Sequence, residues 1–78
     1  MPFVNVRTAR GLLSPEKKTR LHDEITDLLV RIEGGGDPEF RRYVLVLIEE
    51  HPPAAWSAAG QPLTEEAIAA LAGDTVTR

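Results

Sequence analysis

Pro2 is the residue whose position most favours chemistry, because it leads directly into a predicted strand. A small second residue usually allows removal of the initiator methionine, so we expect Pro2 to carry a free secondary amine. An amino-terminal amine held in a folded site is a known catalytic group, whereas the same nitrogen in a peptide bond is inert. The structural alternative is that proline merely begins a strand, where it has no ladder N–H to lose.

Two arginines and a tyrosine follow one another in the sequence, and their side chains are the candidates to stabilise negative charge on a substrate. A base that takes a proton from carbon needs a donor at the enolate oxygen, and one such donor typically contributes ~2.7–4 kcal/mol. We consider Arg42, Tyr43 and Arg41 for this role, with Arg7 and Arg10 as further options. In the structural alternative, the adjacent arginines form a solvated pair and Tyr43 is an aromatic residue at a strand edge.

Apolar side chains could bring the pKa of the Pro2 amine into the working range. A free α-amino group has a reference pKa of ~7.7–8.0, and a base that acts at neutral pH needs a pKa near that pH. Burial disfavours the ammonium form and therefore lowers the pKa. We expect Phe3, Leu45 and Trp56 from neighbouring subunits to form such apolar walls, although Trp56 could equally fill a subunit interface.

Length and composition exclude several classes of protein. The chain has 78 residues and no cysteine, which predicts a single domain (1–78) without disulfides or thiolate metal sites. The net charge is −3 with both signs interspersed, so we expect no nucleic-acid partner. No apolar stretch approaches the ~20 residues of a membrane span and no signal peptide is visible, so we expect a cytoplasmic protein without a membrane partner. His22 and His51 lack further ligands at metal spacing, and we expect neither a metal nor a cofactor.

The hydrophobic pattern predicts a strand, a helix and a second strand. Residues 3–8 are β-branched or aromatic and predict a strand that Gly11 ends. Ser14 and Pro15 are typical of a helix start, and Gly34 stops this helix. A turn or a single helical turn extends through Phe40, and residues 43–48 then form an apolar run. The helix has one apolar stripe, formed by Leu21, Ile25, Leu28, Leu29 and Ile32.

The remaining third of the chain predicts a loop and a last helix. We expect His51 to lie in the loop, Thr64 to cap the helix and Gly73 to end it, with a frayed tail at 74–78. Glu49 and Glu50 are adjacent in the strand and point to opposite faces, so we expect structural salt bridges rather than a shared catalytic role.

The second strand is apolar on both faces, although the chain can cover only one of them with its long helix. The other face would expose a large hydrophobic patch unless a second molecule covers it. We therefore predict a homo-oligomer in which the sheets of neighbouring subunits pack against one another.

Several short motifs occur together in one order. They are Pro2, Gly11, Ser14-Pro15-Glu16-Lys17-Lys18, Val46-Leu47-Ile48-Glu49-Glu50, Trp56 with Ser57-Ala58-Ala59-Gly60, and Leu63-Thr64. In these motifs the chain resembles the 4-oxalocrotonate tautomerase family over about residues 2–64.

The resemblance implies an α+β fold made of one β-α-β unit with a short C-terminal hairpin, assembled as a homo-oligomer of dimers such as a trimer of dimers. It implies a keto–enol tautomerase in which the amino-terminal proline is the general base, acting on a small keto or enol acid. It also aligns a substrate-side serine of the family with Tyr43. Two arginines of the best-studied members are replaced here by Leu12 and Leu45. Arg41 or Arg42 could supply the missing cation.

Two other functions stay open. Related lyases decarboxylate or hydrate small acids with a protonated proline, so Pro2 could act as an acid. Loss of both arginines could instead mark an oligomeric interaction module without catalysis.

Overall fold

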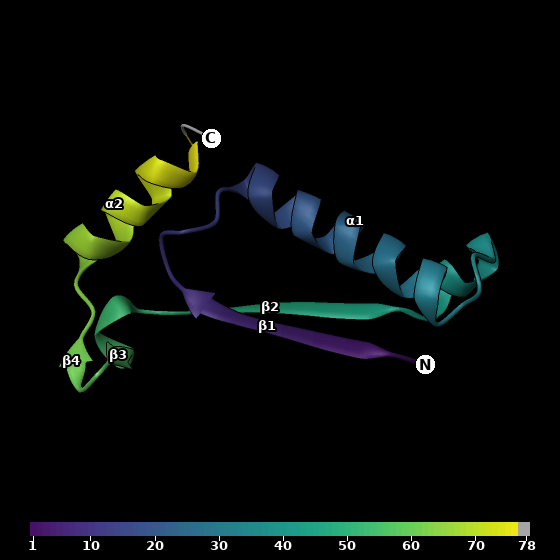
Figure 1. Cartoon of the computed structure of the whole chain (residues 1–78), viewed down its shortest axis with the longest axis horizontal. Coiled ribbons are helices and arrows are strands. Elements are labelled where there is room, and N and C mark those ends of the chain that lie inside the picture. Colours follow the sequence, from purple (N-terminus) through teal and green to yellow (C-terminus); the bar gives the residue numbers. More distant parts are fainter. Residues whose placement is uncertain (77–78) are drawn as a thin grey trace. The chain divides into compact units, whose positions relative to one another are not determined.

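The computed structural model describes residues 1–76 of the chain, with side chains up to residue 72. It forms two compact units, one of Met1–Val6 with Pro15–Ile48 and the other of Arg7–Ser14 with Glu49–Arg78, and we describe each by itself. Its elements are β1 (Phe3–Ala9), α1 (Pro15–Ile32), the 3-10 helix η1 (Pro38–Tyr43), β2 (Leu45–His51), the 3-10 helix η2 (Pro53–Ala55), β3 (Ser57–Ala58), β4 (Gln61–Pro62) and α2 (Glu65–Val76) (Figure 1). This order confirms the predicted α+β class, a β-α-β unit followed by a hairpin and a helix.

β1 and β2 pair into a two-stranded sheet. At one end the Leu45 N–H donates to the Pro2 carbonyl at 3.0 Å, and at the other the Arg10 N–H donates to the His51 carbonyl at 2.8 Å. The first bond joins the beginnings of the two strands and the second joins their ends, so the strands run parallel. The predicted first strand is confirmed and extends to Ala9, before Gly11 turns the chain with a φ of +107°.

The predicted start of the second strand at Tyr43 is wrong, because Tyr43 is the last residue of η1. Asp37 begins this 3-10 helix by accepting a hydrogen bond from the Glu39 N–H at 3.0 Å. The expected helical turn therefore continues past Phe40, and the strand begins at Leu45. The strand also ends later than predicted, so His51 is a strand residue rather than a loop residue.

α1 begins and ends where the sequence predicts it, from Pro15 to Ile32. The chain then turns sharply, and a Cβ atom at Gly34 would lie 2.4 Å from the ring of Phe40. Real Cβ contacts are never this short, so only glycine lets Phe40 pack against the end of α1. Part of the predicted apolar stripe is exposed, since Leu28 is 40% and Ile32 is 72% accessible.

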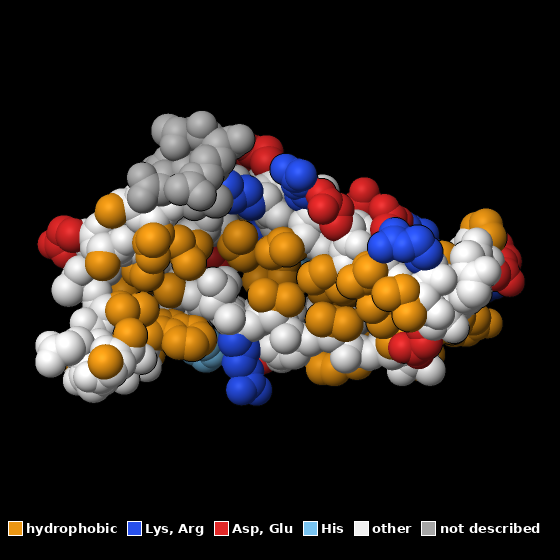
Figure 2. Space-filling view, viewed as in Figure 1, with side chains coloured by type: hydrophobic (Ala, Val, Ile, Leu, Met, Phe, Trp, Pro, Cys, Tyr) orange, Lys and Arg blue, Asp and Glu red, His pale blue; other side chains and the backbone are white. Residues whose placement is uncertain are grey.

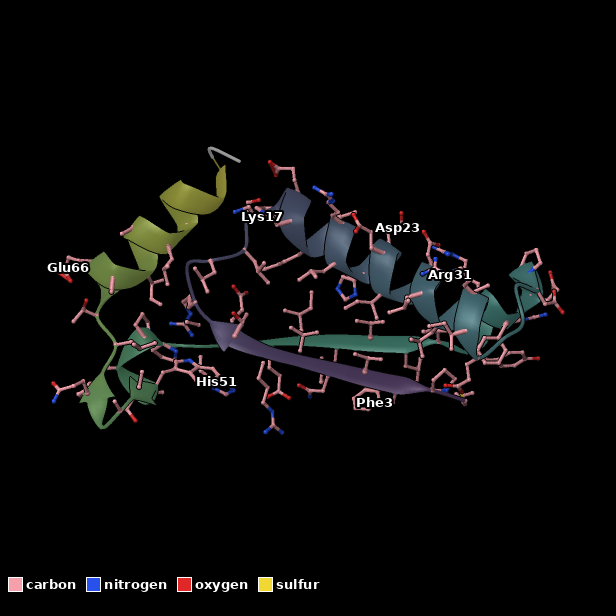
Figure 3. All side chains as sticks on the ribbon, viewed as in Figure 1. Phe3, Lys17, Asp23, Arg31, His51 and Glu66 are labelled. Atoms are coloured by element: carbon pink, nitrogen blue, oxygen red, sulfur yellow. The ribbon has the colours of Figure 1, made fainter. Side chains whose placement is uncertain are left out.

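The sheet differs on its two faces within the first unit. Val4, Val6, Val46 and Ile48 are half-buried and alternate with exposed neighbours. The exposed residues Phe3, Leu45 and Leu47 form what we call the open face, and Phe3 points away from α1 (Figure 3). In Figure 2, further hydrophobic side chains extend along α1 beneath the charged residues of its outer side. β2 thus has apolar side chains on both of its faces, as the sequence predicts, and α1 covers only one of these faces.

The second unit contains a small antiparallel hairpin and α2. Ser57 pairs with Pro62 and Ala58 with Gln61 in β3 and β4. Thr64 caps α2 as predicted, because its Oγ1 accepts from the Ala67 N–H at 3.1 Å, and Ile68 is buried.

The predicted end of α2 at Gly73 is wrong, since the helix continues to Val76. The alanines before Gly73 have high helix propensity, and a glycine inside a helix costs only about 1 kcal/mol. Of the tail predicted at 74–78, residues 77–78 lie outside the described residues.

Candidate active site

Pro2 lies half-buried at the head of β1, in the same compact unit as four of the other candidate site residues. Its carbonyl accepts the Leu45 N–H at 3.0 Å, which fixes the first residue of β2 beside Pro2. Tyr43 and Arg42 come two and three residues before Leu45 and end η1. A candidate base, a cation and a phenol are therefore brought to the same end of the sheet by one backbone hydrogen bond and one helical turn.

Arg42 and Tyr43 form an exposed pair at this end of η1. The Arg42 guanidinium carbon lies 5.9 Å from the centre of the Tyr43 ring, which is within the range of a cation–π contact. Arg42 also forms an ion pair with Glu39 at 3.2 Å, and its side chain is 68% exposed. The Tyr43 ring in turn meets the Phe40 ring edge to face, with 6.3 Å between centroids. Arg42 thus carries a solvent-accessible cation beside an aromatic hydroxyl.

Arg41 points to different partners than its neighbour does. Its two terminal nitrogens form ion pairs with Asp27 and Asp23, which are exposed residues of α1. The hydrogen bond to Asp27 is the main reason that the pKa of the Arg41 guanidinium lies above its ordinary value, with the charges of both carboxylates adding to it. The sequence alone did not show which of the two arginines pairs with carboxylates of α1. The available signal was the i, i+4 spacing of Asp23 and Asp27, which places two carboxylates on one helix face.

Leu45 is 49% exposed and presents a branched alkyl group on the open face, while its backbone N–H is bonded to the Pro2 carbonyl. Leu12 is half-buried and belongs to the second unit. Neither position carries a positive charge.

Trp56 belongs to the second unit, where it is half-buried. Its indole N–H donates to the His51 carbonyl at 3.3 Å, and the two rings meet edge to face with 6.2 Å between centroids. These contacts hold the indole against the end of β2.

The remaining cations considered from the sequence also lie in the second unit. Arg7 forms an ion pair with Glu49 at 3.8 Å, and Glu49 also lies 3.4 Å from His51. The expectation of structural salt bridges at Glu49 is therefore confirmed. Arg10 lines a cavity of about 350 Å³ together with Gly11, Pro52, Pro53, Glu65, Ile68 and Ala69.

Among the side chains that the structure describes, no group of three or more histidine, cysteine or acidic residues could hold a metal ion. His22 is exposed on α1. No helix in the described part of the chain has the length and apolar character needed to cross a membrane.

The sequence pattern of a family described as "Tautomerase enzyme" matches residues 2–66. The match begins at Pro2 and ends at the second residue of α2, so the rest of that helix lies beyond it. No curated protein matches the chain.

Several solved structures with the same fold are described as homologues or family members of 4-oxalocrotonate tautomerase. TomN, a 4-oxalocrotonate tautomerase homologue in the tomaymycin biosynthetic pathway, is 28% identical, with a TM-score of 0.67 over 78% of this chain and 86% of TomN. Another 4-oxalocrotonate tautomerase homologue is 30% identical, with a TM-score of 0.67 over 77% of this chain and 87% of the other. A member of the 4-oxalocrotonate tautomerase family is also 30% identical, with a TM-score of 0.63 over 82% and 92%.

Proposed function

We propose that this chain, which belongs to the tautomerase family, interconverts the keto and enol forms of small 2-hydroxy-dienoate or enol-pyruvate acids, with Pro2 as the general base. As a family member the chain is an enzyme of the tautomerase superfamily. We further propose that the reaction needs no cofactor and takes place in the cytoplasm. The observation that carries the proposal is the family match that starts at Pro2, the residue that heads β1.

The proposed chemistry has two proton transfers. After removal of Met1, the uncharged Pro2 nitrogen takes a proton from a carbon next to the substrate carbonyl, and the electron pair moves to the carbonyl oxygen. The resulting ammonium returns the proton to the enolate oxygen, which gives the enol, or to another carbon of a dienolate, which gives the isomeric ketone. Conversion of the enol to the ketone follows the first of these routes in reverse. Arg42 and the Tyr43 hydroxyl supply donors for the enolate oxygen. Their position beside the strand end that Pro2 begins supports this role.

The apolar positions Leu12 and Leu45 support a substrate with one carboxylate rather than two. A second carboxylate would need its own cation, because an unpaired charge is costly to remove from water. Leu45 and Phe3 both belong to the open face, and their apolar side chains favour a substrate with a hydrocarbon or aryl tail. We therefore place arylpyruvate-type enols and monocarboxylic dienols ahead of dicarboxylates.

We also propose that the active form is a homo-oligomer built from dimers. Phe3 is 60%, Leu45 49% and Leu47 43% exposed, and an isolated chain would leave all three in water. Contact with a second copy across the open face would bury them and would surround Pro2 with apolar groups. Such burial would lower the pKa of its amine, which is the direction that a base at neutral pH requires. Trp56 of a neighbouring copy is a candidate wall of the same site.

The test follows ketonisation of a chemically prepared enol of phenylpyruvate by ultraviolet absorbance as a function of pH. A base requires kcat/KM to rise with pH as the Pro2 amine loses its proton and then to level off. Activity that instead falls as the amine deprotonates would identify Pro2 as an acid, as in the lyase alternative. Conversion at the uncatalysed rate for phenylpyruvate and for a 2-hydroxy-dienoate would favour an interaction module and contradict the proposal.

A further inference from the structure

The two adjacent arginines of η1 are held by different partners, and this difference assigns them different roles. We propose that Arg41 is a positioning residue, whose ion pairs to α1 hold η1 so that Arg42 and Tyr43 stand at the end of the sheet where Pro2 lies. The proposal rests on the proposed function, since it concerns the substrate-binding side of the same site. According to this proposal, Arg42 contacts the substrate and Arg41 does not.

The first step of the argument is the geometry of the Arg41 ion pairs. Both terminal nitrogens of Arg41 are engaged, one by Asp27 and the other by Asp23, 14 and 18 residues earlier in the chain. To contact a substrate carboxylate with both nitrogens, the guanidinium would have to leave two carboxylates. Arg42 is held by Glu39 and by the ring of Tyr43, both within η1, and 68% of its side chain is accessible. The cation that can reach a ligand without breaking contacts to another element is therefore Arg42.

The second step concerns the contacts that keep the orientation of η1. Phe40 packs on Gly34, where a Cβ would lie 2.4 Å from its ring, and Asp37 caps the first turn. Both of these contacts involve the first half of η1. The bridge from Arg41 to α1 constrains the last turn of η1 as well, because it ties this turn to two positions one helical turn apart.

The third step links η1 to the proline. Val44 donates to the Arg41 carbonyl at 3.3 Å, and the next residue, Leu45, donates to the Pro2 carbonyl at 3.0 Å. Two hydrogen bonds of consecutive residues therefore run from Arg41 to Pro2. A change in the position of Arg41 would move the Arg42–Tyr43 pair and loosen the Leu45–Pro2 bond together.

The experiment compares Arg41→Gln, the double variant Asp23→Asn/Asp27→Asn, Arg42→Gln and the control Arg20→Gln. The control removes another exposed ion pair of α1, that of Arg20 with Glu24, without touching η1. Ketonisation kinetics give kcat and KM for each variant, far below its thermal midpoint. We expect Arg41→Gln and the double aspartate variant to lower kcat/KM to the same extent, about threefold to tenfold for partly exposed ion pairs. Combining the two changes should lower kcat/KM no further, and Arg20→Gln should stay within twofold of wild type.

Direct contact of Arg41 with the substrate predicts a different pattern. Release of Arg41 by Asp23→Asn/Asp27→Asn would then leave KM unchanged or lower it, while Arg41→Gln alone would raise KM. That result would overturn the proposal. Equal kcat/KM in wild type and Arg41→Gln would overturn it as well. Arg41→Lys gives a further comparison, since one ammonium can meet one carboxylate but cannot bridge two, and we expect kcat/KM between those of wild type and Arg41→Gln.

A second readout does not need activity, which separates this proposal from the proposed function. Amide hydrogen exchange reports how often the Leu45 N–H leaves the Pro2 carbonyl. We expect Arg41→Gln and the double aspartate variant to reduce protection of the Val44 and Leu45 amides about threefold to tenfold, and Arg20→Gln to change it by less than about twofold. Unchanged protection would overturn the positioning role, even in an active enzyme. An inactive wild type that shows the expected exchange pattern would refute only the proposed function.

Discussion

Leu47 offers the most quantitative test of the proposed assembly through the open face. It is 43% exposed in the single chain, and its neighbour Val46 is half-buried on the opposite face. Burying a whole leucine side chain contributes about 1.5–3 kcal/mol, so covering the exposed fraction should contribute about 0.6–1.3 kcal/mol per chain. A symmetric pair contains the residue twice, which gives about 1.3–2.6 kcal/mol. Leu47→Ala should therefore weaken association about tenfold to eightyfold, at 1.36 kcal/mol per factor of ten.

Sedimentation velocity or native mass spectrometry over a dilution series measures the association midpoint. The matched variant is Val46→Ala, which removes carbon from the covered face and should lower the free energy of unfolding while moving the association midpoint much less. Leu47→Asp should abolish association at all accessible concentrations, because its carboxylate would be removed from water without a partner. The reasoning fails if Leu47→Ala associates as wild type does, or if Val46→Ala shifts the midpoint further than Leu47→Ala.

Three further predictions concern specificity, stability and the alternative site residues. Leu45→Arg should raise kcat/KM for a dicarboxylic 2-hydroxy-dienoate about tenfold to 150-fold relative to a monocarboxylic one, because a hydrogen bond to a charged group contributes about 1.5–3 kcal/mol. Competition assays with both substrates measure this preference, and an unchanged ratio would contradict the prediction. Ala59→Asn should raise the free energy of unfolding by about 0.5–1 kcal/mol in urea titrations, since Ala59 has a φ of +54° that asparagine tolerates better; a destabilised variant would contradict this. Gly34→Ala should lower both kcat/KM and the free energy of unfolding, because its Cβ would clash with the Cβ and Cγ atoms of Phe40; kinetics and a urea titration like those of wild type would exclude this steric cause.

Local signals in the sequence were sufficient for most of the fold. The strand at β1, both ends of α1 and the start of α2 depend on caps, glycines and hydrophobic period, and all of these act within a few residues. The two-faced apolar pattern of β2 likewise survives in the structure as one covered and one open face. Tyr43 was misplaced because its aromatic, apolar surroundings favour a strand. The capping contact of Asp37 and the packing of Phe40 on Gly34 instead continue a 3-10 helix through it.

The placement of the candidate residues could be predicted only in part. Pro2 and the Arg42–Tyr43 pair must come near one another, since Leu45 must pair near the start of β1 if the strands are parallel. Which arginine stays accessible to a substrate could not be predicted, because the answer depends on where η1 meets α1 in space. The roles of Pro2, Arg42 and Tyr43 stay predictions, as do those of Trp56 and Leu45 as site walls, which require neighbouring copies of the chain.

The central claim is that an unblocked Pro2 nitrogen moves a proton between the carbon and the oxygen of the substrate, and one residue added in front of it tests this directly. Two samples are compared in the same ketonisation assay: the native form, with Met1 shown to be absent by intact mass, and a form with a single alanine retained before Pro2. A positioned general base contributes about 10²–10⁴-fold, so the account predicts a loss of at least about 100-fold in kcat/KM, with assembly unchanged. An extended form that converts enol to keto as fast as the native one would contradict the account.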